Sequence, residues 1–319
     1  MQDKYTRIDL YNSNYGGRAY EKMIDECFPN LVKTYYVFKT KSKFKIIFSF
    51  LYSLIKFNFF SKKNHLLTLQ TAPFINLFKK NVLIIHHIDL KYSSFIMRLY
   101  YNYCLLFIFL FRSRIKKIVV VSKYWKEYLK KKGFNNVQII YNSIEINNFN
   151  FSDNEINSFK VKYKMDFKKP IIYIGNLKLL KGFDKVYDLL KNEPYILVGS
   201  GNDSCNLKGV ICLNLTYRGY LLLLKSSDIV ILMSEFIEGW NRTAHEAILL
   251  GKKVIGSGSG GMKELLEIEN RLICKDYNNL LSLVKKEIED NDKNLTSKLI
   301  HQYDKIYFKH NWFKILNNQ

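Results

Sequence analysis

Short apolar runs alternate with longer amphipathic segments along this chain, and the alternation occurs in two successive series. The first series contains runs at 81–89, 115–122 and 137–143, and the second contains runs at 170–176, 194–201, 209–215, 227–234 and 252–259. Short runs that are apolar throughout are typical of strands buried on both faces of a parallel sheet. Amphipathic segments between such strands are typical of crossover helices. The sequence therefore predicts an α/β fold with two doubly wound parallel sheets.

The segment between the two series, 145–169, is polar and rich in Asn, and it has no strand-like period. A chain of 319 residues, of which 48% are hydrophobic, is long enough to fill two separate cores. We therefore expect a first domain at 1–150, a second domain at 151–300 and a short terminal segment at 301–319.

The composition is strongly basic, with 50 Lys and Arg against 28 Asp and Glu and a net charge of +22. Such a surplus favours anionic partners, namely nucleic acid, an anionic membrane or a phosphate-bearing substrate, although a general drift towards Lys and Asn also raises it. The five cysteines form no C-x-x-C pair and the six histidines show no metal-binding spacing. We therefore expect free thiols and no metal site. The polar first residues are not typical of a signal peptide, which favours a cytoplasmic protein.

The stretch EFIEGWNRTAHEAILLG, 235–251, combines a loop carboxylate with a helical one. The preceding strand is expected to end near Ser234, and a helix to begin near Trp240 to Thr243. Backbone N–H groups at a helix N-terminus bind phosphate well, and Gly239 permits close approach. Glu238 before the helix and Glu246 within it could each accept hydrogen bonds from hydroxyls, a pattern that fits a nucleotide sugar. The alternative is two ordinary surface glutamates.

Two further stretches place polar groups at the carboxyl ends of predicted strands, where open α/β sheets bind their ligands. In IIYIGNLKLLKGFDKVYDLL, 171–190, the strand ends at Gly175 and Lys181 stands just before a helix. Lys181 could neutralise phosphate charge, or it could be one more surface lysine of a basic chain. Gly16 and Gly17 lie between a first strand and a first helix, where backbone amides could also hold phosphate or form only a tight turn.

Taken together, these motifs resemble the retaining glycosyltransferases of the GT-B fold, the large group-1 family also called glycosyltransferase family 4. Glu238 and Glu246 match the E-x7-E signature, and EAILLGKKVIGSGSGGMKELL continues the family pattern through Glu264. YIGNLKLLKG matches the G-R-x-x-x-x-K-G loop, LVGSGND the V-G-x-G turn, and IIHHID the strand that ends in His. The matches keep the family order from Gly16 to Glu264.

The resemblance implies two Rossmann-like domains with a cleft between them, and a terminal helix that packs back on the N-terminal, acceptor-binding domain. The C-terminal domain would bind a nucleotide sugar and transfer its sugar, with retention, to an acceptor hydroxyl of a glycan or lipid-linked acceptor. Glu238 would hold hydroxyls of the donor sugar, Lys181 the diphosphate and His87 the transferred sugar, although the adjacent His86 leaves that register open. Neither a metal nor a cofactor is implied. The donor-binding residues would be Gly16, Gly17, His86, Asn176, Lys178, Gly239, Trp240, Asn241, Arg242, Thr243 and Glu246.

Some positions depart from the family pattern. Asn176 replaces the usual arginine of the loop, and Lys178 nearby could supply the missing charge. Asn241, Arg242 and Thr243 replace the usual small residues. A catalytically silent subunit with the same fold therefore stays open, as does a sugar epimerase. A nucleic-acid-binding protein is the third alternative, suggested by charge alone.

The stretch 42–65 concentrates lysines and aromatic residues. One predicted helix face is apolar and consists of Ile47, Phe50, Leu51, Leu54 and Ile55. The other carries polar and basic side chains, namely Lys45, Ser49, Ser53 and Lys56. Such a helix could lie on an anionic membrane surface, or it could be a core helix with a solvated edge. The apolar run at 99–111 is too short to span a bilayer, so we expect a buried or interfacial helix there.

Overall fold

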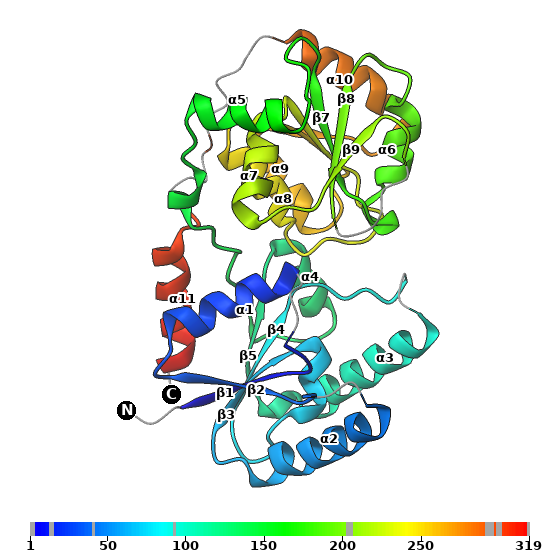
Figure 1. The fold of residues 1–319 in the computed structure, drawn as a ribbon. Helices are drawn as coiled ribbons and strands as arrows, with labels where there is room; N and C mark the ends of the chain where they lie inside the picture. Colours follow the sequence, from blue (N-terminus) through cyan, green and yellow to red (C-terminus); the bar gives the residue numbers. More distant parts are fainter. Residues whose placement is uncertain are drawn as a thin grey trace. The chain divides into compact units, whose positions relative to one another are not determined.

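The computed structural model describes residues 4–12, 16–39, 42–91, 94–201, 207–290, 297 and 302–317. By its internal contacts the chain forms two units (Figure 1). Unit 1 comprises Met1–Ser143 and Ile306–Gln319, and unit 2 comprises Ile144–Lys305. The units thus divide a few residues away from the boundaries at 150 and 301 that the sequence suggests.

Unit 1 contains a parallel sheet of six strands in the order β2-β1-β3-β4-β5-β6. The strands are β1 Tyr5–Asp9, β2 Val32–Tyr36, β3 Asn64–Thr68, β4 Asn81–Ile85, β5 Ile115–Val120 and β6 Val137–Ile139. Its helices are α1 Gly16–Cys27, α2 Lys43–Ile55, α3 Phe95–Leu110, α4 Lys123–Lys131 and α11 Lys305–Asn317. Every residue of β4 is buried, which explains the unbroken apolar run in its sequence.

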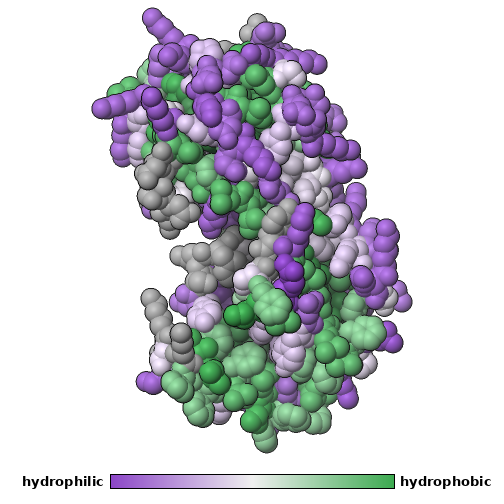
Figure 2. Space-filling model, turned by 90° about the vertical axis from the view of Figure 1, so that its right-hand side faces the viewer, coloured by the Kyte–Doolittle hydropathy of each residue, from purple (hydrophilic) through white to green (hydrophobic). Residues whose placement is uncertain are grey.

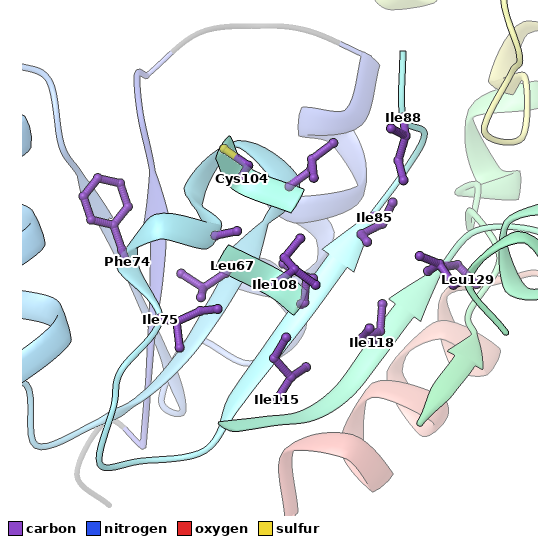
Figure 3. Close-up of a cluster of buried hydrophobic side chains, with 14 of the residues drawn as sticks. Leu67, Phe74, Ile75, Ile85, Ile88, Cys104, Ile108, Ile115, Ile118 and Leu129 are labelled. Carbon is purple, nitrogen blue, oxygen red and sulfur yellow. The ribbon is translucent and has the colours of Figure 1, made fainter. Parts of the chain in front are cut away.

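The core of unit 1 lies where α3 and α4 meet the central strands (Figure 3). Leu67, Ile85 and Ile118 point from three neighbouring strands towards Ile108 of α3, and all four are almost fully buried. On α11, Trp312 is fully buried and its Nε1 donates a hydrogen bond to Tyr20 Oη of α1 (3.2 Å). The last helix therefore packs on unit 1.

Unit 2 contains a second parallel sheet of six strands, in the order β12-β11-β10-β7-β8-β9. The strands are β7 Ile171–Asn176, β8 Ile196–Ser200, β9 Val210–Leu213, β10 Ile229–Leu232, β11 Lys253–Gly256 and β12 Leu272–Ile273. The helices are α5 Asp153–Lys162, α6 Phe183–Leu190, α7 Tyr217–Ser226, α8 Arg242–Leu249, α9 Gly261–Ile268 and α10 Leu280–Glu289. All eight apolar runs predicted as strands are confirmed, whereas β2, β3 and β12 were not predicted.

The apolar face predicted for α2 is divided between the core and the surface. Phe50 and Leu54 pack against the core, and Ser53 from the predicted polar side is fully buried. Ile47, Leu51 and Ile55 are each at least 50% exposed. Because the helix is apolar on nearly its whole circumference, the period in its sequence does not identify the buried side. The run at 99–111 likewise lies mostly in α3, which buries only Cys104 and Ile108. Within the described ranges, no helix is both long and apolar enough to cross a bilayer.

The cysteines also differ in part from expectation. Cys27, Cys104 and Cys274 are free thiols. Cys212 is disulfide-bonded. Sequence spacing alone does not exclude such a bond, because pairing depends on the distance between two side chains in space.

Candidate functional site

The strand order of unit 2 reverses beside β7, because β7 pairs with β8 on one side and with β10 on the other. At such a reversal the loops after the two central strands diverge and leave a crevice at the carboxyl edge of the sheet. The loop after β7 carries Lys181, and the loop after β10 carries Glu238. Sheet topology therefore brings these two sequence-predicted residues to the same place.

Glu238 is a buried carboxylate surrounded by hydrogen-bond donors. It exposes only 6% of its surface. Its Oε1 accepts hydrogen bonds from Lys181 Nζ (2.8 Å), Asn241 Nδ2 (3.2 Å) and Ser234 Oγ. A buried carboxylate is costly without such partners, so these donors stabilise the Glu238 side chain in its buried position and fix its orientation.

Lys181 lies at the end of a short 3-10 turn and is held by the residue that follows it. Gly182 adopts a left-handed φ of +69°, and a Cβ there would lie 2.2 Å from Met233 O and 2.4 Å from Tyr277 Oη. A glycine is therefore required for the loop after β7 to approach the end of β10. Lys181 Nζ also lies 4.5 Å from the centre of the Phe236 ring, and a third of the side chain is exposed.

The glycine cluster after β11 supports the Glu238 loop. Gly261 N donates to Glu238 O (3.0 Å), and Gly260, with a left-handed φ of +61°, would place a Cβ 2.3 Å from the same oxygen. On the other side, Asn241 is left-handed (φ 65°) and its Oδ1 accepts from Ala244 N (2.9 Å), so it caps α8. Gly239, which lies between Glu238 and Asn241 in the sequence, is buried. The backbone of this loop is thus held at both ends.

Glu246 lies one turn into α8, is 2% exposed and has two partners on its Oε1. Arg242 Nε donates at 2.7 Å and Tyr217 Oη at 2.8 Å. Arg242 also donates to Tyr217 Oη (3.0 Å) and its guanidinium lies over the Tyr217 ring. The Arg242 that distinguishes this sequence from the family pattern is therefore a partner of Glu246. Thr243, beside it in the first turn of α8, is half-buried.

Trp240 belongs to the interior of unit 2. It is 2% exposed and packs edge-on against His245 and Tyr303. Its Nε1 donates to His245 Nδ1 (3.2 Å), and burial, with a further contribution from Arg242, lowers the pKa of His245 to about 3. His245 is therefore neutral with its proton on Nε2, and that nitrogen has no hydrogen-bond partner among the described residues.

Asn176 and Lys178 lie at the carboxyl end of β7. Asn176 is the last residue of the strand and is half-buried, and its Oδ1 is buried without a hydrogen-bond partner in the described part of the chain. Lys178 is exposed two residues later. Both therefore lie on the loop that leads to Lys181.

In unit 1 the paired histidines follow β4 and face different surroundings. His86 is half-buried, with its Nε2 3.3 Å from the fully buried Glu21 Oε1 and its ring edge-on to Tyr20. His87 is exposed. Both line a cavity of about 110 Å³ together with Glu21, Thr68, Leu69, Gln70, Ile84, Asp89 and Tyr101. This cavity lies at the carboxyl ends of β3 and β4. Gly16 and Gly17 form the start of α1.

A buried charge network that the sequence did not predict lies beside this cavity. Arg7 of β1 is 1% exposed and donates to Asp25 of α1 (Nε–Oδ1 2.9 Å) and to Asp9. Arg18 of α1 also donates to Asp9 and lies over the Tyr36 ring. Alternating charges in the strand sequence YTRID were the available signal, because a buried strand does not tolerate charges without partners.

No protein-family model matches the chain. One curated relative, an uncharacterized 42.6 kDa protein in the cps region of Klebsiella pneumoniae, is 31% identical over 151 residues. That match covers 44% of this chain and 40% of the relative, so the chain spans less than half of its length.

Solved structures are similar over the whole chain. HepE of Anabaena in complex with UDP-glucose superposes with a TM-score of 0.77 at 14% identity, covering 99% of both chains. The fold is GT-B. WaaG, a glycosyltransferase involved in lipopolysaccharide biosynthesis, superposes with a TM-score of 0.74 at 11% identity, covering 99% of this chain and 100% of WaaG. Sucrose-phosphate synthase of Thermosynechococcus elongatus superposes with a TM-score of 0.70 at 14% identity, covering 99% of this chain and 96% of the synthase. Because the sequence identities are this low, the similarity to these structures establishes the fold alone.

Proposed function

We propose that this protein is a retaining glycosyltransferase that moves a sugar from a nucleoside-diphosphate sugar to an acceptor hydroxyl. In the reaction, the bond between the anomeric carbon and the diphosphate oxygen breaks, and a bond from the same carbon to the acceptor oxygen forms. The acceptor proton passes to a phosphate oxygen of the donor, and the nucleoside diphosphate leaves. The proposed chemistry uses neither a metal nor a cofactor.

The Lys181–Glu238 pair carries the proposal. A carboxylate that already accepts three hydrogen bonds on one oxygen is rigid, and it can accept further ones from sugar hydroxyls. Lys181, partly exposed beside it, would stabilise the negative charge that grows on the leaving diphosphate. Backbone N–H groups of Arg242 and Thr243, in the first turn of α8, would add to this stabilisation.

The nucleotide would occupy the same edge of unit 2. We assign the ribose hydroxyls to Glu246, whose orientation Arg242 and Tyr217 fix. Asn176 and Lys178 would contact the diphosphate, with the Asn176 amide donating a hydrogen bond where the family pattern has an arginine. Gly16 and Gly17 would contribute backbone amides from unit 1. A UDP sugar is the first donor to test, because HepE binds UDP-glucose.

We assign the acceptor to unit 1. The cavity beside His86 and His87 is lined by carboxylate, amide and phenol groups of Glu21, Gln70 and Tyr101, which suit sugar hydroxyls. His87, the exposed member of the pair, would contact the transferred sugar. A growing surface glycan or glycolipid is the favoured acceptor class, a choice supported by the cps-region relative. We also propose peripheral attachment to an anionic membrane, at its cytoplasmic side, through the basic stretch around α2.

The proposal is tested with the purified protein and a panel of UDP, GDP and ADP sugars. We expect one of them to bind and to be hydrolysed slowly without acceptor, and a chelator to leave the rate unchanged. Proton NMR of the released or transferred sugar should first detect the donor's anomeric configuration. Binding without any turnover would instead favour the catalytically silent subunit, the alternative suggested by Asn176 in place of the usual arginine. Absence of binding would overturn the proposal.

A further inference from the structure

Helices α2 and α3 present large apolar side chains to the outside of unit 1. The exposed residues of α2 are Phe44, Ile47, Phe48, Leu51, Tyr52 and Ile55, and those of α3 are Phe95, Ile96, Met97, Leu99, Tyr103, Leu106, Phe109 and Leu110. Phe44, Phe48, Phe95 and Ile96 are each at least 73% exposed. We call this set the α2–α3 apolar face, and Figure 2 shows apolar side chains gathered on this part of unit 1. An apolar patch of this kind marks an interaction surface.

The two helices are fixed on the unit, so the apolar face is a surface of the folded protein. They meet where Phe50 of α2 and Tyr100 of α3 bring their rings to 6.4 Å between centres. Each helix packs on the core along one side only, through Phe50 and Leu54 of α2 and through Cys104 and Ile108 of α3. The apolar side chains opposite these contacts do not stabilise the core.

The charges at this face are all of one sign. Neither helix contains an acidic residue, and Asp89 is the single Asp or Glu in the sequence between Glu26 and Glu127. Exposed basic side chains lie within the two helices or just beyond their ends, namely Lys45, Lys62, Arg98 and Arg112. These four residues, which we call the basic margin, give the face a positive charge that no carboxylate on either helix offsets.

We propose that the α2–α3 apolar face inserts into the acyl region of a lipid bilayer, with its basic margin in the headgroup layer. Insertion of apolar side chains, and not charge attraction alone, then accounts for most of the attachment. The helices have 13 and 16 residues, so they are about 20 and 24 Å long, which is too short to span a bilayer at 1.5 Å per residue. They lie in the plane of the surface.

A second copy of the chain fits this face poorly. A two-fold interface would place the same basic margin against itself, with no carboxylate on either helix to pair with it. An anionic leaflet supplies the opposite charge and the apolar layer at once. The inference rests on the proposed function in one respect: docking would bring the enzyme to an acceptor held in lipid.

Co-sedimentation with vesicles tests the inference without any sugar. The full chain is mixed with neutral phosphatidylcholine vesicles and with vesicles containing phosphatidylglycerol, at 0.1 and 1 M NaCl. Three variants are compared with the parent protein. F48S/F95S/I96S changes the apolar face, K45E/K62E changes its margin, and V161S/I306S/F313S changes three apolar residues that are exposed elsewhere, each by more than half. Circular dichroism checks that each variant is folded.

We expect the parent to bind neutral vesicles and to stay mostly bound to anionic vesicles in 1 M NaCl. F48S/F95S/I96S should lower the partition coefficient at least tenfold on both vesicle types, K45E/K62E should lower it several-fold on anionic vesicles only, and V161S/I306S/F313S should match the parent. Complete release by salt, or binding of F48S/F95S/I96S equal to that of the parent, would overturn the inference. So would a dimer in light scattering that only F48S/F95S/I96S converts to a monomer.

Donor hydrolysis in solution separates this inference from the proposed function. F48S/F95S/I96S should hydrolyse the donor at the rate of the parent, because its three positions lie outside the donor-binding residues. If vesicle binding behaves as expected while no nucleotide sugar is hydrolysed, the docking surface stands and the proposed activity fails. The reverse result leaves the activity in place and refutes the docking surface.

Discussion

Lys181 and Glu238 are 57 positions apart in the chain, yet Lys181 Nζ donates to Glu238 Oε1 at 2.8 Å. The contact forms because β7 and β10 are neighbours in the sheet, so that the loops following them share one edge. Glu238 is buried and Lys181 reaches the solvent, an arrangement in which the lysine can turn from the carboxylate to an incoming phosphate.

Lys181→Ala should lower kcat by about 10²–10³ while changing the donor Kd much less, because leaving-group charge is larger in the transition state than in the ground state. Steady-state rates and donor titrations measure the two effects. Lys185→Ala is the matched control, since Lys185 lies on the next turn and pairs with Glu235. Equal losses in both variants would mean that general positive charge, and not the position of Lys181, is what matters.

Glu238→Gln should reduce turnover by a similar factor while the protein stays folded. The amide keeps the volume of the side chain but presents an N–H group to donors such as Lys181 and Asn241, so sugar hydroxyls lose a charged acceptor. Donor hydrolysis and far-UV circular dichroism are the two measurements. A variant that keeps the parental rate would remove Glu238 from the proposed site.

Tyr217→Phe should raise the Kd of the donor about three- to tenfold, which corresponds to about 1 kcal/mol for one lost hydrogen bond. The phenol donates to Glu246 Oε1, and without it Arg242 alone orients the carboxylate. Isothermal titration with the nucleoside diphosphate gives the value. Tyr187→Phe, which removes a hydrogen bond to Lys208 O on the surface, should leave the Kd unchanged.

Gly182→Ala should destabilise unit 2 far more than a left-handed backbone alone requires. Gly133, two residues after the end of α4 in unit 1, is also left-handed (φ +84°), but a Cβ there meets nothing within 4 Å. Gly133→Ala should therefore cost only the backbone term of about 1–2 kcal/mol. Gly182→Ala adds the clash with Met233 O, and we expect at least twice that loss in urea unfolding. Similar costs for the two variants would show that the loop moves aside easily.

His245 should make stability fall in acid. Its pKa is lowered to about 3 in the folded protein by burial, whereas an unfolded histidine titrates near 6.5. Between these values the unfolded chain binds one more proton, so the free energy of unfolding rises with pH by about 1.4 kcal/mol per unit and the contribution is complete above about pH 6.5. Buried His65 acts in the same direction, with a pKa lowered to about 4.

The slope is measured by urea unfolding at pH 5 and pH 7. His245→Gln keeps an acceptor for Trp240 Nε1 and removes the titration, so its stability relative to the parent should improve by about 2 kcal/mol on going from pH 7 to pH 5. His310→Gln, at an exposed position of α11, should follow the parent at both values. An unchanged difference between His245→Gln and the parent would contradict the assignment of a buried neutral ring.

The strands could be predicted from the sequence because burial on both faces leaves a local trace, an apolar run such as NVLII in β4. The residues near the carboxyl ends of these runs followed directly, so Lys181, Glu238 and Glu246 could be selected as candidates. The partners of Glu246 could not be selected in this way. Arg242 lies four positions before Glu246, a spacing that brings two side chains together on one helix, but nothing in the sequence marks Tyr217, 29 positions away, as the second partner.

The sequence by itself determined the two parallel sheets, because a strand buried on both faces must be apolar at every position whatever surrounds it. The tertiary structure alone decided which loops meet, since the order β10-β7-β8 places Lys181 beside Glu238. It also decided which side of α2 faces outward. That helix is apolar almost all round, so only its packing against the core at Phe50 and Leu54 distinguishes the buried side from the exposed one.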